Sequence, residues 1–121
     1  MYKLQLDLPF IPISLNQLLR MHYHAANKYK KEVYRVVWLL TQNKRPSRPL
    51  IKCRLTFIRK SYRLLDWDGA VGSLKVIVDG LVNSKILKDD TYTITGDWNV
   101  SQEFLSKKKG KGYICVLIEE I

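Results

Sequence analysis

Cysteine is scarce in this chain of 121 residues, which contains only Cys53 and Cys115. The two cysteines lie far apart, neither belongs to a CxxC motif, and each sits in an apolar run. This excludes a small disulfide-rich scaffold. Because the sequence also lacks a secretory signal, we expect two reduced, buried thiols in a cytoplasmic protein.

Long hydrophobic runs are also missing. No segment approaches the ~20 consecutive apolar residues that cross a bilayer, so we expect no membrane partner. Internal repeats, low-complexity tracts and linkers are absent as well. The length predicts a single domain over residues 1–121. The composition, 46% hydrophobic and 26% charged, is ordinary for a globular protein.

Acidic residues are rare in the first half of the chain. Residues 1–65 contain fourteen lysines and arginines but only Asp7 and Glu32, which leaves a net charge of +12. Residues 66–121 contain seven basic and nine acidic residues, a net charge of −2, so the whole chain carries +10. This excess indicates a polyanionic partner such as a nucleic acid. A basic soluble protein without such a ligand is the alternative.

The hydrophobic pattern predicts an α/β (α+β) fold. Apolar alternation predicts strands at 2–8 and 50–60, with Ile51 on the inner face of the second. A third strand is expected from Tyr92 through Gly96 to Phe104, and an interior strand at 113–118. Helical periodicity predicts helices at 27–42 and 70–82 and a short helix capped by Ser14 or Asn16. We therefore expect one compact domain with a mixed sheet of about four or five strands and two main helices.

Five of the eleven acidic residues gather between Tyr62 and Thr95. They are Asp66, Asp68, Asp79, Asp89 and Asp90. Asp66 and Asp68 are two residues apart, so in an extended segment their carboxylates share one face. Lys75 lies one helical turn before Asp79. Carboxylates from two segments with a lysine between them suit Mg²⁺ and phosphodiester hydrolysis.

The same stretch resembles the RusA family of Holliday-junction resolvases. The family pattern is Asp-x-Asp-Asn, a lysine on the next helix, a D-[GA]-L turn and an Asp-Asp pair. Here it reads as Asp66-Trp67-Asp68-Gly69, Lys75, Asp79-Gly80-Leu81 and Asp89-Asp90, and the proline-rich opening with Ser14 and Asn16 also resembles the family. Two features depart from the pattern: Gly69 replaces the usual Asn, and the interval from Asp68 to Lys75 is longer than in the shorter members.

The resemblance implies a Mg²⁺-dependent endodeoxyribonuclease that resolves four-way DNA junctions, with Mn²⁺ as a possible substitute ion. Asp66, Asp68 and Asp90 would bind the metal, and Lys75 would stabilise charge in the transition state. It also implies a homodimer that binds branched DNA, a nucleoid-associated place in the cytoplasm and a phage or prophage origin. Trp38, Trp67 and Trp98 are candidates for an interface or for the core.

Basic residues outside this stretch are candidates for phosphate contacts. With Asn16 from the opening motif, they are Arg20, Lys28, Lys31, Arg35, Arg59, Lys60, Arg63, Lys107, Lys108, Lys109 and Lys111. The segment from Arg20 to His24 is expected to be a loop. His22 and His24 lack the further His or Cys partners of a zinc site.

Several alternatives remain open at this point. Asp68 is a natural N-cap for the expected helix near Ala70, and Asp79 is interpreted mainly as structural. In one alternative, all three proposed metal ligands serve only as caps and turn residues. Gly69 and the longer interval from Asp68 to Lys75 keep open a non-catalytic junction-binding module. A nuclease for flap or RNA substrates is a further hypothesis, because similar carboxylates serve many phosphodiesters.

Overall fold

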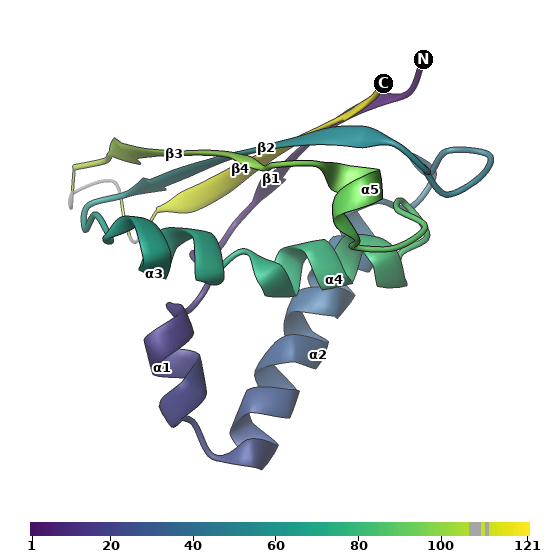
Figure 1. Cartoon of the computed structure of the whole chain (residues 1–121). Helices are drawn as coiled ribbons and strands as arrows, with labels where there is room; N and C mark the ends of the chain where they lie inside the picture. Colours follow the sequence, from purple (N-terminus) through teal and green to yellow (C-terminus); the bar gives the residue numbers. More distant parts are fainter. Residues whose placement is uncertain (107–109, 111) are drawn as a thin grey trace.

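Four strands form one mixed sheet in the computed structural model, which describes residues 1–106, 110 and 112–121. They are β1 (Lys3–Leu8), β2 (Cys53–Ser61), β3 (Asn99–Phe104) and β4 (Tyr113–Glu120). The order is β1-β4-β2-β3; β4 runs antiparallel to both neighbours, and β2 and β3 are parallel (Figure 1). The predicted mixed sheet and the interior position of β4 are confirmed.

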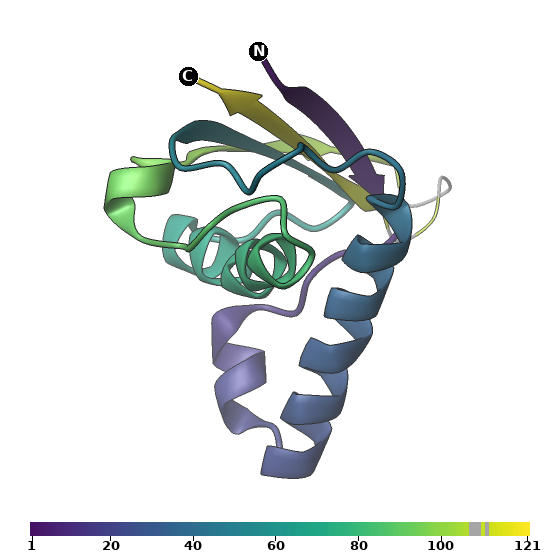
Figure 2. The same cartoon turned by 90° about the vertical axis from the view of Figure 1, so that its right-hand side faces the viewer.

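The helices lie on one face of this sheet (Figures 1 and 2). The two longest are α2 (Tyr23–Leu40) and α4 (Lys75–Asn83), and periodicity also predicted two main helices. Shorter segments are α1 (Leu15–Arg20), α3 (Trp67–Gly72) and α5 (Tyr92–Thr95). Helices α3 and α4 run beneath the sheet, while α1 and most of α2 extend away from it (Figure 2). Within the described ranges, no helix is long and apolar enough to cross a membrane.

The core lies between the sheet and helices α2 and α4. Alternation brings Cys53, Leu55 and Phe57 of β2 inward, as predicted, and all are buried. The expectation for Ile51 is wrong, because β2 begins only at Cys53 and Ile51 is exposed. Leu50 is buried instead and forms an isolated bridge with Leu87.

The helix expected at 70–82 is two helices. The Ser73 hydroxyl donates to the Ala70 carbonyl at 2.7 Å, and α4 begins at Lys75 with no side-chain cap on Leu74. At Gly72 an added Cβ would lie 2.9 Å from the Leu15 side chain, so glycine permits α1 to approach α3 closely. Glycine and a serine bonded to its own turn weaken a helix, which explains the break.

Two other expectations on secondary structure are wrong. The start of the third strand is the helical turn α5, in which Thr95 N–H donates to the Thr91 carbonyl at 3.1 Å and Gly96, at φ 58°, ends the turn. The expected loop at 20–24 contains the start of α2, four residues before Asn27. The His22 ring Nδ1 accepts from the His24 N–H at 3.2 Å and caps this helix.

Candidate functional site

Lys75 and Asp90 come together although they are 15 residues apart in sequence. The Lys75 ammonium donates to an Asp90 carboxylate oxygen and, at 2.7 Å, to Oδ1 of Asp79 one turn further along α4. The segment before Asp90 is fixed to the fold because the Lys88 N–H donates to the Leu50 carbonyl at 3.0 Å. The structure therefore joins the helix lysine to the second member of the Asp-Asp pair.

Asp89 has a different role from Asp90. Its Oδ1 accepts from the backbone N–H of Asp90 at 2.8 Å, which stabilises the local turn.

The contact between Lys75 and Asp90 shifts the pKa values of both groups. The hydrogen bond that Lys75 donates to Asp90, together with the positive charge of Lys75, holds the pKa of Asp90 below its ordinary value. Partial burial acts to lower the pKa of Lys75, but its bonds to Asp79 and Asp90 outweigh that effect and raise it. Both groups are thus charged at neutral pH.

Asp66 caps the start of α3. Its Oδ1 accepts from the Gly69 N–H at 3.2 Å. The Gln102 side chain of β3 fixes the preceding residue, accepting from the Leu65 N–H at 2.9 Å and donating to the Leu65 carbonyl at 2.7 Å. The interpretation of Asp68 as the cap is therefore wrong. Asp68 lies exposed in the first turn, and it and Asp66 do not form an extended pair.

Gly69 permits this capping geometry. A Cβ built at this position would lie 2.6 Å from Oδ1 of Asp66, closer than real Cβ contacts come. Any larger residue there, including the Asn of the family pattern, must move the Asp66 carboxylate. The departure at Gly69 thus leaves Asp66 oriented toward the helix backbone.

The three expected metal ligands do not gather around one point. Asp66 precedes Lys75 by nine residues, and α3 and α4 follow each other in nearly the same direction (Figures 1 and 2). At 1.5 Å per residue this separates the two by roughly 13 Å along the helices. In the part of the chain that is described, no group of three or more His, Cys, Asp or Glu side chains could hold a metal ion. In this arrangement the carboxylates do not fit a three-ligand magnesium site.

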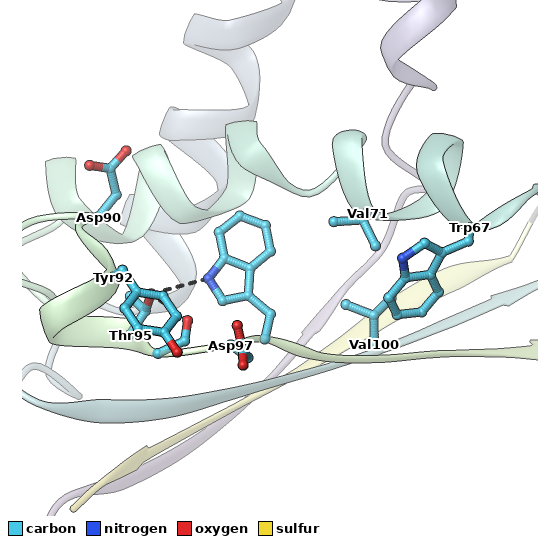
Figure 3. A pocket seen from close by; sticks show the side chains of 9 residues that line it. Trp67, Val71, Asp90, Tyr92, Thr95, Asp97 and Val100 are labelled. Carbon is cyan, nitrogen blue, oxygen red and sulfur yellow. Dashed lines mark hydrogen bonds between the residues drawn. The ribbon is translucent and has the colours of Figure 1, made fainter.

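A cavity of about 480 Å³ lies between α3 and Asp90, on the helix-covered side of β3 (Figure 3). Trp67 and Val71 of α3 line one end, and Asp90 and Tyr92 lie at the other. Trp67 and Tyr92 are 63% and 69% exposed, so their ring faces are available to a ligand. Exposed aromatic rings can stack on nucleobases, whereas Asp90 and Asp97 in the same lining repel a phosphate backbone.

The other two tryptophans differ in their surroundings. Trp98 also lines the cavity, packs on Phe57 with ring centroids 5.6 Å apart, and donates from Nε1 to the Thr95 hydroxyl at 3.2 Å. Trp38 is exposed near the end of α2, with the Arg45 guanidinium 5.1 Å from its ring centroid.

Tyr92 lines the cavity but was not among the predicted site residues. Its position next to the Asp-Asp pair was the available signal.

The predicted phosphate-binding residues fall into separate groups. Asn16 and Arg20 are exposed on α1, and Lys28, Lys31 and Arg35 are exposed on α2. Spacings of three and four residues place the last three on one helix face. Such a face can contact a phosphate backbone or only water.

The basic residues of β2 and the following loop have specific contacts. Lys60 is half-buried and has its ammonium 3.9 Å from Glu103 and 5.4 Å from the Tyr113 ring centroid. Arg63 is exposed, whereas Arg59 is buried. The expectation for Lys107, Lys108, Lys109 and Lys111 falls on residues outside the described part of the chain.

No protein-family model matches this chain, and no curated protein matches it in sequence. The likeness to the RusA pattern therefore rests on the residues quoted above. Of that pattern, the structure brings together Lys75, Asp79 and Asp90, and it leaves Asp66 and Asp68 at the far end of α3.

Proposed function

We propose that this chain is a structure-selective endodeoxyribonuclease of branched DNA that depends on Mg²⁺ or Mn²⁺. The pairing of Lys75 with Asp90 is the observation that carries the proposal. These two residues belong to separate parts of the family pattern, and in the fold they form an ion pair. The net charge of +10 supports a polyanionic substrate. The choice of four-way DNA junctions as its preferred form follows from the resemblance alone.

The residues have distinct parts in this proposal. Lys75 is an ammonium that stands beside a carboxylate and can stabilise negative charge on a phosphate oxygen. Asp90 is the carboxylate expected to interact with the metal, whose chemistry would be the activation of water. Asp66 and Asp68 supply further negative charge on α3. Asp66 and Asp68 lie apart from Asp90, so we do not propose that the three carboxylates bind one metal ion together.

The proposal includes a homodimer in the cytoplasm that acts on both strands of a junction. Trp38 and Trp67 are exposed tryptophans available for such an interface or for DNA. A prophage origin belongs to the same proposal and follows from the resemblance alone.

A non-catalytic junction-binding module is the second candidate. The separation of Asp66 and Asp68 from Asp90 favours it, because a hydrolytic metal needs its ligands on one point. This candidate predicts salt-sensitive junction binding without incision.

Incision of a labelled synthetic four-way junction in Mg²⁺ tests the proposal, with linear duplex as the comparison substrate. Asp90→Asn should abolish incision and leave junction binding equal or tighter, because repulsion of phosphate falls. Asp97→Asn is the matched control, since Asp97 is exposed and lines the same cavity but lies outside the pattern. Equal cleavage by the Asp90 variant contradicts the assignment. Tight binding without incision by the unmodified chain favours the binding module.

A further inference from the structure

Arg59 is a buried cation that has no anionic partner within the described part of the chain. It continues the inward alternation of Cys53, Leu55 and Phe57 on β2, and its side chain is only 6% exposed. Its Nη1 donates to the Arg63 carbonyl at 2.9 Å, while its buried Nε has no hydrogen-bond partner among the residues that the structure describes. Across the described residues, no ion pair includes Arg59.

Such an arrangement is unfavourable for the folded chain alone. A guanidinium loses its hydration on burial, and a backbone carbonyl compensates only part of that loss. Desolvation accordingly lowers the pKa of Arg59. Buried charges in proteins are normally paired, which makes Arg59 a candidate to receive an anion from outside the chain.

A cavity of about 460 Å³ adjoins this arginine. Arg59 and Arg63 line it from β2 and the following loop, Ser14 lines it as the N-cap of α1, and Gln17 lines it from within that helix. Apolar wall is supplied by Ile13 and Leu65. The cavity is therefore basic and polar on some sides and apolar on others, and its volume exceeds that of a bare ion.

We propose that this cavity is a binding site for a phosphate group of a nucleic-acid strand. The phosphate pairs with the guanidinium groups of Arg59 and Arg63, a planar donor set that matches phosphate oxygens. The attached sugar packs on Ile13 and Leu65. Free phosphate shares this chemistry, so the experiment distinguishes the two sources.

The site lies directly before the capped start of α3, since Leu65 both lines the cavity and precedes Asp66. A strand bound here passes close to Asp66 and Trp67. The inference rests on the proposed function only in taking its phosphate from DNA. It requires no hydrolysis, and it can be tested without divalent metal.

The test uses the whole chain labelled with ¹⁵N-arginine, in EDTA and at constant ionic strength. Inorganic phosphate and single-stranded hexathymidylate are titrated separately, with chloride as the reference, while the Nε–H signal of Arg59 is followed. Arg59→Gln identifies that signal. Arg63→Gln removes a second cation but keeps the carbonyl that accepts from Arg59, so it preserves the fold. Arg54→Gln is the control, because Arg54 is exposed on the opposite face of β2.

Both probes should shift the Arg59 signal in the unmodified chain and in Arg54→Gln. Arg63→Gln should weaken the binding roughly tenfold or more, as the loss of a charge-assisted contact predicts. Absence of any shift overturns the proposal, as does equal affinity of Arg63→Gln and Arg54→Gln. A shift with phosphate but not with hexathymidylate overturns the nucleic-acid source.

The outcome is separable from that of the nuclease test. An unmodified chain that binds hexathymidylate through Arg59 but incises no junction supports the phosphate site and contradicts the nuclease. A chain that incises junctions without any change at Arg59 contradicts the phosphate site alone.

Discussion

The contact between Gly69 and Asp66 yields a quantitative test of the site's conformation. Asp66 caps α3 through the Gly69 N–H, and removing an N-cap carboxylate costs about 1 kcal/mol. Asp66→Ala should therefore lower the free energy of unfolding by about that amount. Gly69→Ala places a Cβ 2.6 Å from the present position of Oδ1 of Asp66, so the carboxylate must move and we expect the cap to be lost in that variant as well.

Alanine also stabilises a helix relative to glycine by about 0.5–1 kcal/mol. The loss of the cap and this gain nearly cancel, so Gly69→Ala alone should change stability by no more than about 0.5 kcal/mol. In the Gly69→Ala background, Asp66→Ala should then cost almost nothing. The expected coupling between the two sites is about 1 kcal/mol, above the ~0.3–0.5 kcal/mol within which independent mutations add.

Urea denaturation of the four proteins in this cycle measures the coupling. Ser14→Ala provides a matched control, because Ser14 caps α1 by accepting from the Gln17 N–H at 3.2 Å and does not contact Gly69. Its cost should be the same with Gly or Ala at position 69. If Asp66→Ala costs equally in both backgrounds, the Gly69 contact does not orient Asp66 and the reasoning is refuted.

Two further predictions concern titratable groups. Asp90→Asn should destabilise the chain by about 0.5–1 kcal/mol at pH 7, as for a partly exposed ion pair. Because the pKa of Asp90 is lower in the folded chain, this contribution is present above pH 3.8 and is lost as the pH falls through the lower folded value. Urea unfolding of both proteins from pH 2 to 6 should therefore give free energies of unfolding that converge at the acidic end. A constant difference between these free energies would contradict the prediction. Burial raises the pKa of Cys53 to about 11, so roughly one thiol in a thousand is ionised at pH 8 and native Cys53 should resist a thiol reagent until the chain unfolds. Reaction of Cys53 as fast as that of an unfolded control would contradict that assignment.

The regular elements were predictable where one physical signal dominated. Alternation in β1 and β2 and the doubly apolar run of β4 predict strands, because the pleat orients residues in turn to the helix-covered face. The same signal was wrong at Tyr92–Thr95. There Ile94 and Thr95 are both oriented inward, one after the other, which fits a helical turn closed by Gly96.

The break between α3 and α4 could not be predicted from periodicity alone. Val71, Leu74 and Val78 keep helical spacing across it, since both helices cover the same face of the sheet. The break depends on Gly72 and on the Ser73 hydroxyl, whose bond to its own turn competes with the helix. Likewise, Arg59 was expected only as a phosphate contact, although its parity with Phe57 on β2 places it on the buried face.

The position of Lys75 explains why it meets Asp90 while Asp66 and Asp68 stay apart from them. Lys75 is one turn from Asp79 and faces the loop that contains Asp90, so both contacts follow from its place at the start of α4. The long interval from Asp68 adds a second helix between the acid pair and this lysine. A shorter interval would place both on one turn or two of a single helix. If one metal is shared by Asp66 and Asp90 when the chain cuts DNA, Asp66 must leave the cap and the start of α3 must approach Asp90. Gly69→Asn displaces the same carboxylate without DNA, so a gain of Mg²⁺-dependent incision in that variant would identify capping of α3 as the feature that limits catalysis.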